Sequence, residues 1–127
     1  MDAEKALAEL KAISAQVEEA VVFTSEGEAI ASTISAEEDA SRVVSAAATL
    51  LSESDSLHGE DAPPVTQLQA ATEDGCVFVV REGVRTIAAT TGPDPVIGLV
   101  MYDLRSCLRA LSEEPKKPAR RRKAESK

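Results

Sequence analysis

Apolar residues recur along this chain with two different periods, and the changes of period divide it into helices and strands. Residues 2–16 repeat apolar side chains every three or four positions, which predicts an amphipathic helix with Asp2 as its N-cap. The apolar positions of this helix are Ala3, Ala6, Leu7, Leu10 and Ile13. Residues 17–24 and 28–34 then have the pattern of strands, and the turn signal between them predicts a first hairpin.

A second helix is expected to begin at Ser35, because Glu38 lies three positions further on and completes a capping box. Its apolar stripe consists mostly of small side chains: Ala36, Ala40, Val43, Val44, Ala47, Leu50 and Leu51. Such a helix can be approached closely on more than one side. We expect it to cover the sheet and also to contact a second copy of itself. The alternative is that its alanines only favour helix formation.

Residues 65–72 mix polar and apolar side chains, with Val65, Gln67 and Gln69 on one face and Leu68 on the other. This mixture is typical of an edge strand. A second subunit could extend the sheet at such an edge by pairing with its backbone.

The centre of the sheet is expected to be a hairpin of residues 76–80 and 84–90. The first run is almost continuously apolar, as in a strand covered on both faces, and the second is rich in β-branched residues. Gly83 lies between them and can adopt the positive φ of a tight turn.

After a break at residues 91–95, a last helix is expected with Asp94 as N-cap and Pro95 as its first residue. Arg105 and Arg109 lie on its polar side, where we expect them to be solvated or paired with acidic neighbours. Its apolar face comprises Val96, Ile97, Val100, Met101, Leu104, Cys107, Leu108 and Leu111.

The chain is predicted to form one domain over residues 1–112, followed by a disordered basic tail, residues 113–127. The tail has two prolines, no apolar periodicity and a run of like charge. Residues 1–114 carry a net charge of −14 and residues 115–127 one of +6. An acidic body repels anionic lipid and nucleic acid, so any such contact would go through the tail.

The composition argues against an enzyme or a small-ligand sensor. Among 127 residues only Phe23, Phe78 and Tyr102 are aromatic, which favours flat packed layers over a deep pocket. Cys76 and Cys107 are expected to be buried and reduced, and a single histidine makes a zinc site improbable. That residue, His58, is expected at the solvent-facing end of a helix.

The protein is expected to be cytoplasmic. No apolar run is long enough to cross a bilayer, and the first residues lack the basic and apolar regions of a signal peptide.

The order helix, strand, strand, helix, strand, strand, strand, helix predicts an α+β domain with a profilin-like, antiparallel sheet and helices on its faces. In this order the chain resembles the Roadblock (dynein light-chain roadblock) domain. The motifs that carry the resemblance are Leu7-x-x-Leu10, Ala20-Val21-Val22-Phe23, the Gly27 turn with Ala29-Ile30-Ala31, the strand pair from Gly75 to Thr90, and Ile97-Gly98-Leu99-Val100. One departure is Glu18-Glu19, where the family often has glycine.

The resemblance implies a five-stranded antiparallel sheet, with the first and last helices on one face and the middle helix on the other. It also implies homodimers in which the middle helix and the edge strand meet their equivalents. The predicted dimer interface is Ala40, Val43, Ala47, Leu50, Leu51, Val65, Gln67 and Gln69.

The resemblance further implies a noncatalytic adaptor that binds and regulates a small Ras-like GTPase, in bacteria one of the gliding-motility polarity type. The sequence has no phosphate-binding Gly-x-x-x-x-Gly-Lys-Ser/Thr loop, and we expect no cofactor. Regulation could proceed by donating an arginine, for which Arg42, Arg81, Arg85, Arg105 and Arg109 are the candidates, or by ordering the GTPase's switch segments, which we favour. The predicted partner-binding residues are Arg42, Arg81 and Arg85. The alternative is a scaffold whose tail binds anionic lipid, nucleic acid or an acidic protein.

Overall fold

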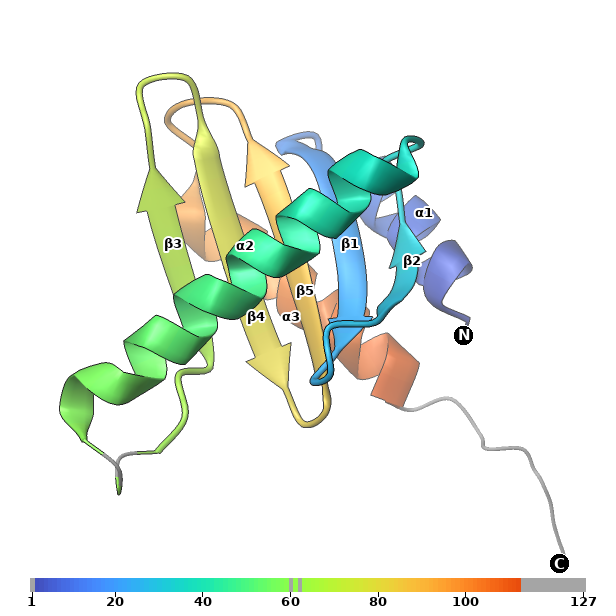
Figure 1. The fold of residues 1–127 in the computed structure, drawn as a ribbon. Coiled ribbons are helices and arrows are strands. Elements are labelled where there is room, and N and C mark those ends of the chain that lie inside the picture. The colour runs from blue at the N-terminus through green and yellow to red at the C-terminus, as the bar shows by residue number, and fades with distance from the viewer. Residues whose placement is uncertain (1, 60, 62, 113–127) are drawn as a thin grey trace, which may run out of the picture.

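The computed structural model describes residues 2–59, 61 and 63–112, which form three layers around one antiparallel sheet (Figure 1). The strand order is β2-β1-β5-β4-β3. The helices and strands are α1 (Ala3–Ile13), β1 (Val17–Thr24), β2 (Ala29–Ser32), α2 (Glu37–Asp55), a 3-10 turn (Ser56–His58), β3 (Gln67–Ala71), β4 (Cys76–Glu82), β5 (Arg85–Thr91) and α3 (Ile97–Ser112). The α+β class, the element order and the five-stranded antiparallel sheet are all confirmed.

The hairpin of β4 and β5 lies at the heart of the sheet, as predicted. β5 is the middle strand and pairs with both β1 and β4. Gly83, in the turn between β4 and β5, has φ +64°, a conformation that glycine adopts at little cost.

Two separate apolar clusters cover the two faces of the sheet. On one face α1 and α3 pack over buried side chains that include Phe78, Val80 and Ile87. On the other face α2 packs over Val79 and Ala88, and Figure 1 shows it crossing the strands obliquely. The alternation of Phe78, Val79 and Val80 between the clusters explains why β4 is apolar without interruption.

The first helix begins as predicted, and the other two begin later. The carboxylate of Asp2 accepts a 2.8 Å hydrogen bond from the Lys5 amide. The predicted capping box is wrong: the N-cap of α2 is Ala36, which makes no side-chain cap bond, so Ser35 lies one position too early. The acidic residues of the first turn still suit the helix dipole.

The start of α3 was predicted about two residues too early. Asp94 has φ +60°, which is not the extended conformation of an N-cap, and the helix begins at Ile97. The amide of Val96 instead donates a 2.6 Å hydrogen bond to the side chain of Gln16. A distant residue therefore supplies the contact that the local sequence was expected to supply.

Several predicted strand and helix positions differ in the structure. Glu18 and Glu19 replace glycines that the Roadblock family often has in the connection before the first strand, but here they lie within β1, where the pairing with β5 shifts register. Val65 precedes β3 and packs on the α2 side, so it does not share a face with Gln67. Ile13 was expected in the core, but 71% of it is exposed.

The predicted disordered tail, residues 113–127, lies outside the described residues. His58 ends the 3-10 turn, and its side chain is likewise outside the described part. Within the described ranges, no helix combines the length and the apolarity needed to span a membrane.

Candidate functional site

The outer edge of β3 is available for pairing with another strand. β3 pairs with β4 alone, and the described residues place no strand on its other side. The Arg81 amide bonds to the Thr66 carbonyl and the Thr72 amide to the Gly75 carbonyl, each at 2.8 Å. In an antiparallel pair the residues that bond to the neighbour alternate with residues whose backbone groups point away. The N–H and C=O groups that point outward are therefore those of Gln67, Gln69 and Ala71.

The side chains of β3 divide between the two faces. Leu68 and Ala70 are half-buried beneath α2, whereas Gln67, Gln69 and Ala71 are exposed. On that exposed side the side-chain Oε1 of Gln67 accepts a 2.6 Å hydrogen bond from the Arg105 guanidinium. The edge that was predicted from a mixed polar pattern is confirmed as an edge.

The helix part of the predicted dimer interface is only partly available to a second copy. Ala40, Ala47 and Leu51 are buried against the chain's own sheet. Val43 is half-buried, and Leu50 is 38% exposed. The predicted stripe spans two sides of the helix, because its sheet-facing residues and its outward residues are both apolar. A contact between the α2 helices of two subunits remains a prediction. Of the predicted helix residues, only Val43 and Leu50 are accessible enough to take part in it.

The outward side of α2 is composed of short side chains. Its exposed residues between the first and last turns are Ser41, Arg42, Ser45, Ala46, Ala48, Thr49, Leu50 and Ser52. Apart from Arg42 and Leu50 none is larger than threonine. Another helix could therefore approach this side closely.

A group of three residues ties the end of α2 to the beginning of β3. The Arg81 guanidinium donates a 2.8 Å hydrogen bond to the Asp55 carboxylate and one of 2.9 Å to the Val65 carbonyl. The same Asp55 oxygen accepts a 2.7 Å hydrogen bond from the Val65 amide. These bonds hold the α2 end and the β3 edge in one arrangement. We call Asp55, Val65 and Arg81 the α2–β3 clamp.

The clamp changes the interpretation of two residues. Arg81 was a partner-binding candidate, but it is half-buried, and its Nε and one Nη atom donate to Val65 and Asp55 within the chain. Asp55 was not singled out from the sequence. It lies 26 positions from Arg81, and an aspartate at the end of a helix carries no local signal of such a contact.

The loss of thermal stability on breaking the α2–β3 clamp should depend on pH. The Arg81 guanidinium, and secondarily the Val65 amide, hold the pKa of Asp55 below its usual value. A carboxylate with a lowered folded-state pKa stabilises the fold above its unfolded pKa of about 3.9, and this is lost as pH falls toward the folded value. We expect Asp55→Asn to lower Tm at pH 7, by an amount that shrinks below about pH 4. When Asp55→Asn is made in a protein that already carries Arg81→Gln, the Tm loss at pH 7 should be much smaller. Equal Tm losses from Asp55→Asn alone at pH 7 and pH 3 would contradict the assignment.

The three candidate arginines do not form one cluster. Arg42 lies on the outside of α2 and pairs at 3.2 Å with Asp39 of the same helix. Arg85 lies opposite Glu82 in the hairpin, and Glu82 accepts a 3.4 Å contact from Arg109 of α3. Residues directly opposite in a ladder share a face. Arg85 is therefore on the α3 side of the sheet, whereas Arg81 points to the α2 side.

Neither cysteine has the surroundings of a nucleophile. Both are free and buried, as expected from the sequence. Burial, with a contribution from the Glu9 carboxylate, raises the pKa of Cys107 to about 11, so little thiolate is present at neutral pH. Over the residues that the structure covers, no group of three or more His, Cys, Asp or Glu side chains is arranged to hold a metal ion.

Comparison with solved structures identifies the class of fold. A Roadblock/LC7 domain from Streptomyces avermitilis superposes with a TM-score of 0.79 at 16% identity, covering 88% of this chain and 96% of that one. MglB of Myxococcus xanthus gives 0.64 at 11% identity, with 87% and 89% covered. The gliding protein MglB of Thermus thermophilus gives 0.63 at 14% identity, with 85% and 84% covered.

The chain therefore has the fold of a bacterial-type Roadblock/LC7 domain, which confirms the resemblance drawn from its sequence motifs. No family model matches the sequence, and no curated protein matches it. At these low identities the likeness concerns the fold.

Proposed function

We propose that this protein is a noncatalytic, cytoplasmic, homodimeric adaptor that binds a small Ras-like GTPase and regulates its GTP turnover. The observation that carries the proposal is an open strand edge beside a helix with a small-residue outer side, on a Roadblock fold. Similar solved structures include one gliding protein, MglB, and an MglB with a tetrameric arrangement. The tetrameric arrangement supports self-association, and the Roadblock resemblance is what suggests a polarity-type GTPase as the partner.

In the proposed dimer two β3 strands pair antiparallel and continue the sheet across both subunits. The outward backbone groups of Gln67, Gln69 and Ala71 would supply the hydrogen bonds. The outer sides of the two α2 helices would then lie next to each other, with Val43 and Leu50 as the apolar contacts. The α2–β3 clamp would keep helix and edge in the relative position that this pairing requires.

Dimerisation through this edge can be tested with a proline that spares the rest of the sheet. The Gln69 amide points away from β4, so Gln69→Pro removes an outward donor without removing a bond between β3 and β4. We expect the dimer dissociation constant to rise at least tenfold by analytical ultracentrifugation, with an unchanged circular dichroism spectrum. Gln69→Ala is the matched control, because it loses the same side chain but keeps the amide. Equal dissociation constants for the two variants would exclude the β3 edge.

Ordering of the GTPase's own switch segments is the favoured mode of regulation. An inserted arginine contributes about 10³–10⁵-fold to GTP hydrolysis where one is used. Arg81 is engaged in the clamp, and Arg42 and Arg85 lie in different parts of the domain, on opposite faces of the sheet.

The regulatory proposal is tested with a small Ras-like GTPase of the polarity type. We expect a complex by gel filtration in at least one nucleotide state, and a changed rate of GTP hydrolysis. Arg42→Ala and Arg85→Ala should each reduce that change less than tenfold; a loss of 10³ or more would identify an arginine donor instead. Absence of a complex in both nucleotide states would overturn the regulatory role and leave the scaffold alternative. That alternative predicts salt-sensitive binding to anionic vesicles, nucleic acid or an acidic protein that is lost when the basic residues of the tail are replaced.

A further inference from the structure

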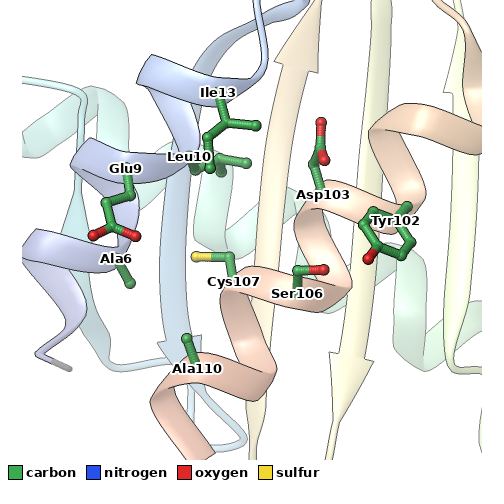
Figure 2. A pocket seen from close by; sticks show the side chains of 9 residues that line it. All are labelled: Ala6, Glu9, Leu10, Ile13, Tyr102, Asp103, Ser106, Cys107 and Ala110. Atoms are coloured by element: carbon green, nitrogen blue, oxygen red, sulfur yellow. The ribbon is translucent and has the colours of Figure 1, made fainter.

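The surface of α1 and α3 that faces away from the sheet contains an apolar groove of about 220 Å³ (Figure 2). Its walls are the two helices, and its floor includes Leu10 and Cys107. Figure 2 shows the Cys107 sulfur pointing towards α1, between the helices. We call this feature the α1–α3 groove. It lies on the opposite face of the sheet from α2, so the proposed dimer does not cover it.

Large apolar side chains stand exposed along the α1–α3 groove. Ile13, at the end of α1, is 71% exposed, and Tyr102 of α3 is 66% exposed. Leu99 is 56% exposed and lies one turn before Tyr102, which places it on the same side of α3. The amphipathic pattern of α1 placed Ile13 on the buried face and that of α3 does not include Leu99 or Tyr102, yet all three side chains are exposed. Contiguous exposed apolar residues of this kind are typical of a protein-binding surface.

The charged residues of the groove are all acidic. Glu9 of α1 and Asp103 of α3 line it, and no lysine or arginine does. A second copy of this chain would bring the same carboxylates against them, which disfavours self-association at this face. The chain's own tail is basic but contains no large apolar side chain. Neither occupant matches both the apolar and the acidic character of the groove.

We propose that the α1–α3 groove binds an amphipathic helix of a second partner protein, with an apolar stripe flanked by lysine or arginine. The apolar stripe would cover Ile13, Leu10 and Tyr102, and the basic residues would pair with Glu9 and Asp103. A helix suits this groove better than an extended peptide. Both walls are helices, whose backbone groups bond internally, so no strand edge is present to satisfy an extended backbone. The groove would occur twice in a dimer, once on each subunit.

The chain provides its own reporter for this binding. Tyr102 is the only tyrosine and there is no tryptophan, so intrinsic fluorescence arises from one residue in the groove. The probe is a synthetic 18-residue helical peptide with leucines at three- and four-residue spacing and flanking lysines, without aromatic residues. Titrated into the full-length protein, it should change Tyr102 fluorescence with a Kd on the order of 10–100 µM and weaken with added salt. At about pH 9, where more of the Cys107 thiol is ionised, it should also slow iodoacetamide labelling of Cys107 but not of Cys76, which does not line the groove.

Variants of the protein show where the peptide binds. Ile13→Ser and the double variant Glu9→Gln/Asp103→Asn should each raise Kd at least fivefold. Leu57→Ser is the matched control for Ile13→Ser, because it also replaces a large exposed aliphatic side chain. Leu57 is 76% exposed and does not line the groove. Glu26→Gln is the control for the carboxylates. If the controls weaken binding as much as the groove variants, or if no variant changes it, the groove is not the site.

Variants of the peptide show what the groove selects. The same peptide with glutamate in place of lysine should bind at least tenfold more weakly; equal binding would overturn the basic character of the partner. No binding of the lysine peptide at 1 mM would overturn the proposal. Salt alone is the last control. If 0.5 M salt without peptide already changes Tyr102 fluorescence and speeds Cys107 labelling, the chain's own tail occupies the groove, and the proposal is wrong.

Discussion

Replacement of Phe78 by alanine is expected to lower the free energy of unfolding by about 3–5 kcal/mol. Phe78 is in the middle of β4, fully buried, and packs in the cluster beneath α1 and α3. The cost combines the lost burial of the ring with the cavity that it leaves. The chain has only two phenylalanines, and the neighbours of Phe78 are mainly Ala, Val and Leu, whose short side chains cannot extend into the cavity.

The loss is measured by urea denaturation at one fixed protein concentration, because dimerisation would add to the apparent stability. Leu57→Ala is the control, since Leu57 is largely exposed and its truncation should change stability by less than about 0.5 kcal/mol. A loss below about 1 kcal/mol for Phe78→Ala would mean that the core beneath α1 and α3 is not packed as described.

Gly75→Ala is expected to destabilise the domain by about 2–3 kcal/mol, although it adds only a methyl group. A Cβ atom at residue 75 would lie 2.3 Å from the carbonyl oxygen of Thr91. That oxygen belongs to the backbone at the end of β5, next to the pairing of Thr91 with Cys76, so a side-chain rotation cannot relieve the contact. The strands must separate locally, and the ladder between β4 and β5 is weakened at this end.

Gly98→Ala provides the matched control for this substitution. Gly98 is in the first turn of α3, and a Cβ atom there has no neighbour within 4 Å. Because alanine favours a helix over glycine, Gly98→Ala should be neutral or stabilise by up to about 1 kcal/mol. Both free energies of unfolding are obtained from the same urea experiment. A stable Gly75→Ala variant with an intact hairpin would show that β4 and β5 do not approach so closely at this position.

The capping residues show where prediction from local sequence stopped. Asp2 was identified correctly because its partner, the Lys5 amide, lies three residues away. The start of α3 was placed too early because Gln16, from the connection between α1 and β1, binds the Val96 amide. A local sequence pattern can indicate a contact between residues three positions apart, such as Asp2 and Lys5. It cannot indicate one between residues as distant as Gln16 and Val96.

The α2 residues show a similar limit for the candidate site. Alanine occupies both the sheet-facing and the outward side of this helix, so the predicted stripe combined Ala47, which is buried against the sheet, with Leu50, which is exposed. The position of the helix over the sheet makes that separation. The edge strand was easier, because its alternation of polar and half-buried residues follows directly from the two faces of a strand.

The order of helices and strands, the central hairpin, the edge strand and the contrast between acidic body and basic tail all follow from residues near one another in the chain. They are visible in the sequence because periodicity, turn chemistry and charge density are local properties. The tertiary structure alone decided that Asp55 engages Arg81, that Arg81 and Arg85 face opposite sides of the sheet, and that Ile13 and Tyr102 border one groove. These depend on how distant segments pack, which is set by the burial of whole faces and not by any neighbouring residue.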